Sequence, residues 1–261
     1  MLFRNLALVA AVAVPALARA TYSLSTYCDN PEMTPEELAE FKAVAAEANE
    51  EVKKRGEIEA REDAITINVY VHVVASGKTW DEGWIPQDKV HLQINMLNTD
   101  FARTNIKFEL AGLYYVLQEQ WAQDLDPPIM KAYLRKGTYQ DLNLYYVRSF
   151  EKKGLGGYCT LPLANVTDGR DYSHDGCTIN HELIAGTPVS VYDLGRTTVH
   201  EVGHWLGLRH TFEGGCSKNN DGFTDTAAEA EAAFGCPVGR NTCPEFPGLD
   251  PINNHMDYTY E

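Results

Sequence analysis

The chain has 261 residues, of which 44% are hydrophobic and 23% charged, and its formal net charge is −15. This composition excludes a wholly disordered chain and suits one substantial folded core or two small ones. The acidic charge argues against nucleic acid or an anionic membrane as a partner, because either would need clustered lysine and arginine.

The first twenty residues have the order of a secretory signal peptide. An apolar run from Leu6 to Val14 follows Arg4 and precedes a small-residue pattern at 18–20. The run is well short of the ~20 residues that span a bilayer. We therefore expect residues 1–20 to be removed and the protein to be secreted and extracellular, with no membrane anchor.

Residues 21–60 form a polar segment with one predicted helix. Thr34 can cap a helix that begins at Pro35 with an acidic first turn and ends near Arg55. The basic cluster at 53–55 fits a cleavage site for a furin-like processing protease, and it fits equally well a cationic helix end that complements the dipole. The segment is predicted to be a propeptide or a peripheral helical segment.

From residue 64 onward, strands alternate with helices. The predicted strands cover 65–74, 106–117, 142–148, 155–163 and 177–181, and the predicted helices cover 86–103 and a segment beginning at Pro127. This order indicates an α/β sheet domain.

Six cysteines, at positions 28, 159, 177, 216, 236 and 243, are expected to form disulfides in an oxidising extracellular compartment. No Cys-x-x-Cys spacing occurs, which argues against a cysteine-bound structural zinc. Cys159 and Cys177 flank a polar loop and are predicted to pair with each other. That loop holds Asn165-Val166-Thr167, so Asn165 is a predicted glycosylation site.

The stretch HEVGHWLGLRH, which begins at His200, carries the chemistry. Residues four apart share one face of a helix, so the imidazoles of His200 and His204 can converge on one ion. Gly207 can take the left-handed conformation that ends the helix and lets His210 return as a third ligand. Three neutral imidazoles leave a fourth tetrahedral position open, as in catalytic zinc sites. We predict one Zn²⁺ per chain.

Glu201 directly follows the first predicted ligand and is the predicted general base. It is placed to take a proton from zinc-bound water, whose pKa zinc lowers towards roughly 7, and to pass it to the leaving amine. The alternative is an amphipathic helix with incidental histidines. Four constrained positions and a glycine match the motif together, which disfavours that alternative.

The remaining histidines are weaker metal candidates. His181 precedes a glutamate but has no second histidine four residues on, and we predict a strand-end residue. His72 and His91 lie in strand and helix core patterns and are predicted to be hydrogen-bonded core residues. His174 and His255 are predicted to be loop residues.

The zinc stretch resembles the extended signature of the metzincins, and its surroundings resemble the pappalysin family, in particular its fungal extracellular metalloprotease branch. The supporting stretches are NTDF at 98–101, GGYCTLP at 156–162, TFEGGC at 211–216, DT at 225–226 and NNHMDY at 253–258. The resemblance covers roughly residues 60–261. It implies a metzincin catalytic domain over 61–261, with a twisted mixed sheet, an active-site helix below it and a small irregular C-terminal subdomain.

The same resemblance assigns roles near the metal. Met256 would form the methionine turn under the zinc, and Tyr258 would be a catalytic residue that stabilises the transition state. Substrate would lie extended along the lowest strand, near Thr178 to His181. The oxygen-rich loop at 216–225 corresponds to a region where relatives bind calcium, so a Ca²⁺ site is predicted there.

By similarity Cys216 pairs with Cys243. Relatives continue beyond the position of Glu261 with a further cysteine and a helix, so we expect a chain truncated at its C-terminus. Cys236 is then left over, and it is expected either to link two chains or to remain a reactive thiol. Cys28 is predicted to supply a thiolate to the zinc in a latent form, although Asp29 replaces the family's usual glycine.

The predicted function is that of a secreted zinc-dependent metalloendopeptidase acting on protein or peptide substrates. We expect a monomer. The alternative is a secreted zinc-binding protein whose activity is weak or lost because the C-terminal segment is missing.

Overall fold

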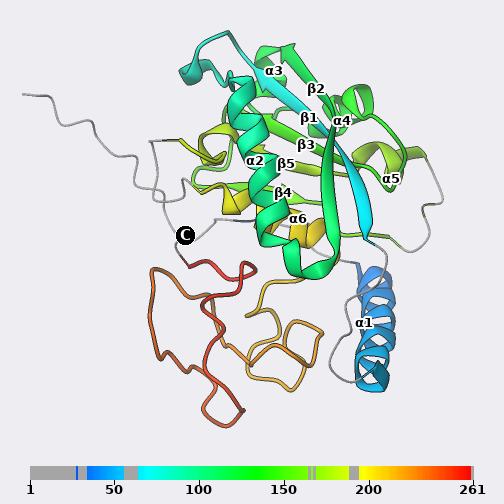
Figure 1. Ribbon diagram of the computed structural model, residues 1–261, viewed down its shortest axis with the longest axis vertical. Coiled ribbons are helices and arrows are strands. Elements are labelled where there is room, and N and C mark those ends of the chain that lie inside the picture. The colour runs from blue at the N-terminus through cyan, green and yellow to red at the C-terminus, as the bar shows by residue number, and fades with distance from the viewer. Residues whose placement is uncertain are drawn as a thin grey trace, which may run out of the picture.

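The computed structural model describes residues 28, 34–55, 64–163, 166, 169–187 and 194–259 of the chain. A five-stranded sheet forms its upper half, in the order β2-β1-β3-β5-β4 (Figure 1). The strands are β1 (Ile65–Ala75), β2 (Ile106–Leu117), β3 (Leu142–Val147), β4 (Gly157–Cys159) and β5 (Cys177–Asn180). All neighbouring pairs are parallel except β4 and β5, so the sheet is mixed, as predicted.

The central strands are buried on both faces, which explains their nearly continuous apolar sequences. All six residues of β3 are buried, and β1 is buried from Val71 to Ala75. Neighbouring side chains face different cores, since Val73 belongs to one buried cluster and Val74 to another. Parallel strands are usually covered in this way, because the connecting helices pack on the sheet.

Helices supply both covers. α2 (Gln87–Asp100) and α6 (Arg196–Trp205) share one core with the sheet, and α4 (Pro127–Leu134) covers the other face through Met130 and Leu134. Among the helices of the described ranges, none combines the length and the apolar character that crossing a bilayer requires.

Short elements connect these parts. They are the helices α3 (Glu119–Ala122) and α5 (Gly169–His174) and the 3₁₀ turns η2 (Trp80–Glu82), η3 (Ala102–Thr104) and η4 (His181–Leu183). α5 lies where a polar loop was predicted. His174 is its last residue, so the loop prediction for His174 is wrong.

Two element predictions change in length. The strand predicted over 155–163 shrinks to β4, because its partner β5 ends where η4 begins at His181 and leaves no further ladder to join. The helix predicted over 86–103 stops at Asp100 and tightens into η3, after which Asn105 turns left-handed with a φ of 58°. α1 (Pro35–Arg55) and β2 have the predicted bounds.

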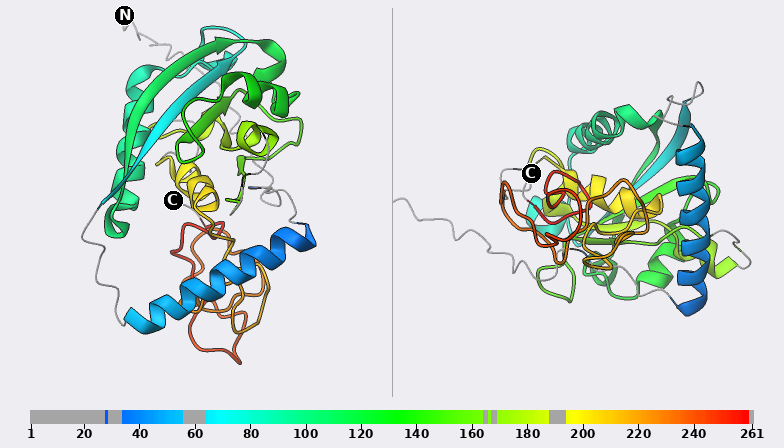
Figure 2. Two further views of the ribbon diagram at one scale, coloured as in Figure 1. Left: turned by 90° about the vertical axis from the view of Figure 1, so that its right-hand side faces the viewer. Right: turned by 90° about the horizontal axis from the view of Figure 1, so that it is seen from below.

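Residues 206–259, here called the lower region, lie beneath α6 (Figure 1). They contain no helix or strand, only an isolated bridge between Gly235 and Thr259. Figure 2 shows α1 lying along one flank of this region. The predicted irregular C-terminal subdomain is therefore confirmed.

Candidate metal centre and active site

α6 carries the first two predicted ligands. It begins after Gly195, whose φ is 73°, and every residue from Thr197 to His204 is buried. Burial of this run means that its polar side chains project into an enclosed interior.

α6 ends where the motif predicts. Its last residue is Trp205, and Gly207 has a φ of 95°, a conformation that glycine adopts without steric cost. The chain turns back and brings His210 beside the helix. The Nε2 atom of His204 lies 3.1 Å from Nε2 of His200 and 3.2 Å from Nε2 of His210. The three predicted ligands therefore meet at one point.

The outer nitrogen of each ring is held by an oxygen. Nδ1 of His200 donates to the carbonyl of His255 at 2.6 Å, and Nδ1 of His204 donates to the carbonyl of Leu208 at 2.8 Å. Nδ1 of His210 lies 2.8 Å from a carboxylate oxygen of Glu213. Since these oxygens accept, each proton belongs on Nδ1, and each Nε2 lone pair faces the common centre.

Burial also keeps the helical pair neutral. It lowers the pKa of His200 to about 3, with His210 adding to the effect. It lowers the pKa of His204 well below its usual value, with His200 and His210 adding to the effect. Three converging imidazole lone pairs need a cation between them, so these residues fit a metal ion.

Glu201 is buried next to this centre. A Cβ on Gly157 would lie only 2.8 Å from its Oε1, so β4 closes over the carboxylate. Among the described residues, neither carboxylate oxygen has a hydrogen-bond partner of ordinary geometry. Burial raises the pKa of Glu201 to about 8, with the Cys28 thiol opposing the shift. A perturbed buried carboxylate beside a metal-binding group is typical of a functional acid or base.

The lower region contributes two further predicted residues. Met256 packs under α6, where a Cβ on Gly203 would overlap its sulfur, and its carbonyl accepts from the backbone N–H of Thr211. The hydroxyl of Tyr258 lies 3.1 Å from Nε2 of His210, and its ring packs edge-on against that imidazole. Both side chains therefore adjoin the metal centre.

Cys28 is a fourth donor at this point. It is buried, and one ligand atom from each of Cys28, His200, His204 and His210 lies within 4.8 Å of the other three. Tyr258 donates to the Cys28 carbonyl at 3.1 Å, and Cys28 forms a parallel bridge with Gly157 of β4. Within the described ranges, these four residues are the one group of three or more His, Cys, Asp or Glu side chains that lie close enough together to hold a metal ion.

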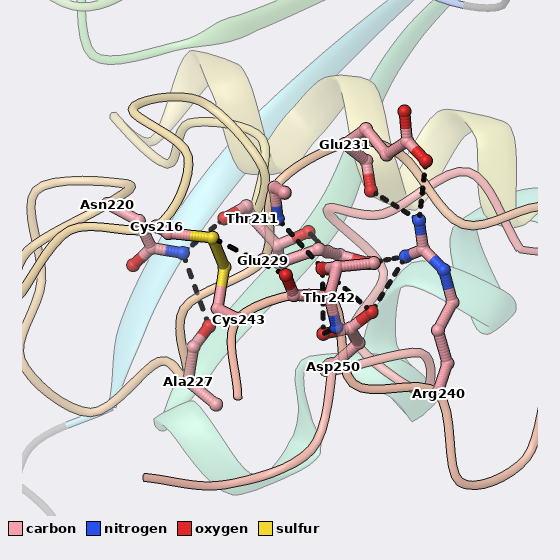
Figure 3. The surroundings of a disulfide bond; sticks show 11 residues. Thr211, Cys216, Asn220, Ala227, Glu229, Glu231, Arg240, Thr242, Cys243 and Asp250 are labelled. Atoms are coloured by element: carbon pink, nitrogen blue, oxygen red, sulfur yellow. Dashed lines mark hydrogen bonds and ion pairs between the residues drawn. A yellow bond between two sulfur atoms is a disulfide. The ribbon is translucent and has the colours of Figure 1, made fainter. Parts of the chain in front are cut away.

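A polar network fixes the loop that follows His210 (Figure 3). Thr211 donates to Glu229 at 2.7 Å, and its carbonyl accepts from the amide of Asn220. Arg240 pairs with Glu229 at 2.6 Å and with Asp250 at 3.0 Å. Thr211, the residue after His210, is therefore held by three hydrogen bonds, to Glu229, Asn220 and Met256.

The structure pairs Cys159 with Cys177 and Cys216 with Cys243, as predicted. The first pair joins directly opposed residues of β4 and β5. Cys236 is exposed and outside both disulfides. The predicted glycosylation site Asn165 lies outside the described residues.

The substrate prediction needs correction. Thr178 to His181 are not at the sheet edge, because β4 covers β5, and the edge strand is β4. His72 is a buried histidine bonded to Asn143, as predicted. The core prediction for His91 is wrong, since it lies on the exposed face of α2.

His181 was predicted to be a strand-end residue, but β5 ends at Asn180 and His181 is the first residue of η4, while His255 lies in a turn. The Ca²⁺ site stays a prediction. In its loop, Asn220 is bonded to backbone carbonyls and Asp221 accepts from the N–H of Phe223.

Sequence reasoning missed the groups behind the ligands. Glu213, Glu229 and Arg240 carry no periodic pattern, and the acceptor of His200 is a backbone carbonyl that no side chain announces. Glu213 alone had a local signal, since an acidic residue three positions after a ligand can reach back to it.

The comparisons with known proteins agree with this geometry. Residues 164–260 match the peptidase family M43, described as pregnancy-associated plasma protein-A. An extracellular metalloprotease of Pyricularia oryzae is 44% identical over 232 residues, covering 89% of this chain and 81% of the relative. One of Neurospora crassa is 40% identical, covering 100% of this chain and 90% of the relative. The chain belongs to the M43 (pappalysin) family. It is an extracellular metalloendopeptidase.

Solved structures resemble this M43 peptidase as well. A mutant of Tannerella forsythia promirolysin matches with a TM-score of 0.66 and 25% identity, covering 90% of this chain and 87% of that one. Mature mirolysin of the same organism, in complex with a cleaved peptide, matches with a TM-score of 0.61 and 27% identity, covering 77% of this chain and 86% of that one. Membership of this family means that the peptidase holds a metal ion and acts on protein or peptide substrates.

Proposed function

We propose that this peptidase uses a single zinc ion held by His200, His204 and His210, with Glu201 as general base. The observation that carries the proposal is the convergence of three imidazoles, since Nε2 of His204 lies 3.1 Å from Nε2 of His200 and 3.2 Å from Nε2 of His210. Three histidines with an open fourth position form a catalytic rather than a structural zinc set. When bound there, zinc supplies Lewis-acid polarisation of the scissile carbonyl and lowers the pKa of water.

Glu201 moves the proton. Its carboxylate is buried beside the ligands and has no ordinary hydrogen bond that would compete for its lone pairs. It takes a proton from the attacking water and delivers it to the leaving amine, so one residue serves as base and then as acid. Enclosure under β4 excludes bulk water, which strengthens both transfers.

Tyr258 completes the polar lining. Its hydroxyl lies 3.1 Å from Nε2 of His210, and burial raises its pKa, so the phenol stays protonated. A protonated phenol can donate to the carbonyl oxygen as negative charge develops on it. Met256 below Gly203 has a packing role and no part in proton transfer.

Substrate is expected on the edge of β4. Gly157 has no side chain between the edge and Glu201, so an extended peptide paired there would present its backbone to the carboxylate. Cys28 already forms a backbone bridge at Gly157. The segment around Cys28 and a substrate therefore compete for the same edge.

We infer from this competition that the N-terminal segment makes the full chain latent. Cys28 lies within ligand distance of the imidazoles, where a thiolate fills the open fourth position. Its backbone occupies the substrate edge at the same time. Cleavage near the basic residues at 53–55 releases both constraints. A form starting near Gly56 should be more active than the full chain on the same peptide, and equal activity would reject latency.

The central test compares wild type with Glu201→Gln, each as the form starting near Gly56. Wild type should hydrolyse casein, lose activity with a chelator and regain it with zinc. Glu201→Gln should keep about one zinc per chain but lose hydrolysis by roughly 10²- to 10⁴-fold, because an amide cannot accept the proton. Loss of zinc in the variant contradicts the assignment of the base. Zinc binding by wild type without any hydrolysis would favour the secreted zinc-binding alternative.

A further inference from the structure

The third imidazole needs support that the first two do not. His200 and His204 are fixed by α6, whereas His210 belongs to the lower region, which has no regular secondary structure. Its ring direction therefore depends on local contacts. Glu213 provides them, because one carboxylate oxygen accepts from Nδ1 of His210 at 2.8 Å and from its backbone N–H at 3.3 Å.

Arg209 fixes that carboxylate in turn. Its Nε and Nη2 lie 2.7 Å and 2.5 Å from the second oxygen of Glu213. The guanidinium fork places two donors on this one oxygen, which anchors it and restricts where the other oxygen, the one that holds His210, can lie. In the folded chain the side chains of Arg209 and Glu213 are only 20% and 31% exposed, so a cover shields most of the pair from water.

α1 is that cover. The guanidinium of Arg209 lies 5.4 Å from the centre of the Phe41 ring, within cation–π range. Phe41 also meets Phe223 edge-on at 6.3 Å. A Cβ on Gly222 would lie 3.0 Å from the Phe41 ring, so the loop and the helix are in close contact.

One face of α1 makes all of these contacts. Phe41, Ala45 and Asn49 are spaced four apart and therefore share a face. Ala45 is buried, and Asn49 donates to the carbonyl of Gly222 at 3.0 Å and accepts from the N–H of Thr224 at 3.1 Å. Figure 2 shows the backbone of α1 beside the lower region.

We propose that Arg209 and Glu213 are positioning residues for His210, and that α1 holds the pair in place, so that contacts made by the N-terminal helix strengthen metal binding. The inference rests on the proposed zinc site. It concerns a route from α1 to the third ligand that does not involve Cys28.

The test measures metal affinity by competition with a chromophoric chelator, in the full chain carrying Cys28→Ser so that the thiol cannot contribute. Glu213→Gln should weaken zinc binding by roughly 10- to 100-fold, the range for losing the partner of a ligating histidine. Arg209→Lys keeps the charge but loses the fork, and should weaken it less. The visible spectrum of the cobalt form should change in Glu213→Gln, because His210 shifts.

The helix is tested by two matched substitutions. Ala45→Arg places a large charge on the docked face, and Ala46→Arg places the same charge on the exposed neighbour. Ala45→Arg should weaken zinc binding roughly three- to thirtyfold, and Ala46→Arg should not. Melting of the metal-free proteins shows whether the sheet half is intact in each variant.

The outcomes separate this inference from the proposed function. If the Cys28→Ser parent binds no zinc, the proposed site itself is wrong. If the parent binds zinc but Glu213→Gln binds it equally well, or Ala45→Arg and Ala46→Arg behave alike, the positioning inference is overturned and the zinc site stands.

Discussion

The sheet half and the lower region reach a fixed structure by different means. In the sheet half, apolar side chains such as Leu144 and Val73 pack in large buried clusters. In the lower region, many of the buried side chains are polar, including Glu229, Asp250 and Asp257. Apolar packing is non-directional and tolerant of substitution, whereas a buried ion pair fails when one partner is removed.

The difference matters because the metal centre joins the two parts. The sheet half supplies His200, Glu201 and His204 through α6, and the lower region supplies His210 and Tyr258. Loosening of the lower region should therefore remove one proposed ligand while leaving the proposed base and the other two proposed ligands in place. The two disulfides offer the first way to test this.

Removing the Cys216–Cys243 bond should have the largest effect on stability. The cysteines are 27 residues apart, so the crosslink removes about 3.5 kcal/mol of chain entropy by the loop-closure estimate. Replacing both by serine should raise hydrogen exchange throughout 211–250 and weaken zinc binding, with β1 and β3 still protected.

The matched control replaces Cys159 and Cys177, which are 18 residues apart and carry a similar loop-closure entropy. There β4 and β5 remain paired by their backbone ladder. Overall stability should fall, but exchange in 211–250 should not change. If both double variants loosen the lower region equally, the contrast between the two halves is wrong.

The same contrast explains what the sequence predicts and what it does not. The sequence predicts β1 and β2 because strand side chains alternate between the two faces of a sheet and β-branched residues favour strands. The motif residues His200, Glu201 and His204 were predicted because helical spacing is geometric. Arg240, Glu229 and Glu213 were not, since contacts between irregular segments leave no period in the sequence. The edge position of β4 also could not be derived, because strand order is a tertiary property.

Arg240→Met should have the next largest effect on the free energy of unfolding. The substitution leaves the buried carboxylates of Glu229 and Asp250 without their cation, and breaking a buried pair in this way costs about 3 kcal/mol. Denaturant unfolding should show the loss, and Arg240→Lys should recover part of it. A stability equal to wild type in Arg240→Met would mean that the network in Figure 3 contributes nothing.

The pH dependence of stability that Glu229 causes should be a smaller effect than the loss of Arg240. Burial raises the pKa of Glu229 to about 7, although Thr211 opposes the shift. The folded protein therefore binds this proton more tightly than the unfolded chain does, and stability falls as pH rises from about 4.5 through about 7. When the pH is raised from 5 to 7.5, the free energy of unfolding should fall by about 2 kcal/mol less in Glu229→Gln than in wild type. Comparing slopes cancels Glu201, which is present in both proteins. Equal slopes would show that Glu229 is ionised across this range.

The smallest effect is expected at Cys236. This thiol is exposed on the lower region and outside both disulfides, so Cys236→Ser should change stability by less than about 0.5 kcal/mol. Its chemistry should nonetheless be visible, because an unpaired cysteine in an extracellular protein reacts or links two chains. Labelling of the native protein with a maleimide, followed by peptide mapping, should identify residue 236, unless non-reducing electrophoresis shows a dimer that Cys236→Ser abolishes. Cys28 serves as the internal comparison, since it is buried at the metal centre and should label only after the N-terminal segment is displaced. If Cys28 labels as fast as Cys236 in a native monomer, the segment around Cys28 does not stay on β4. The proposed latency would then be wrong.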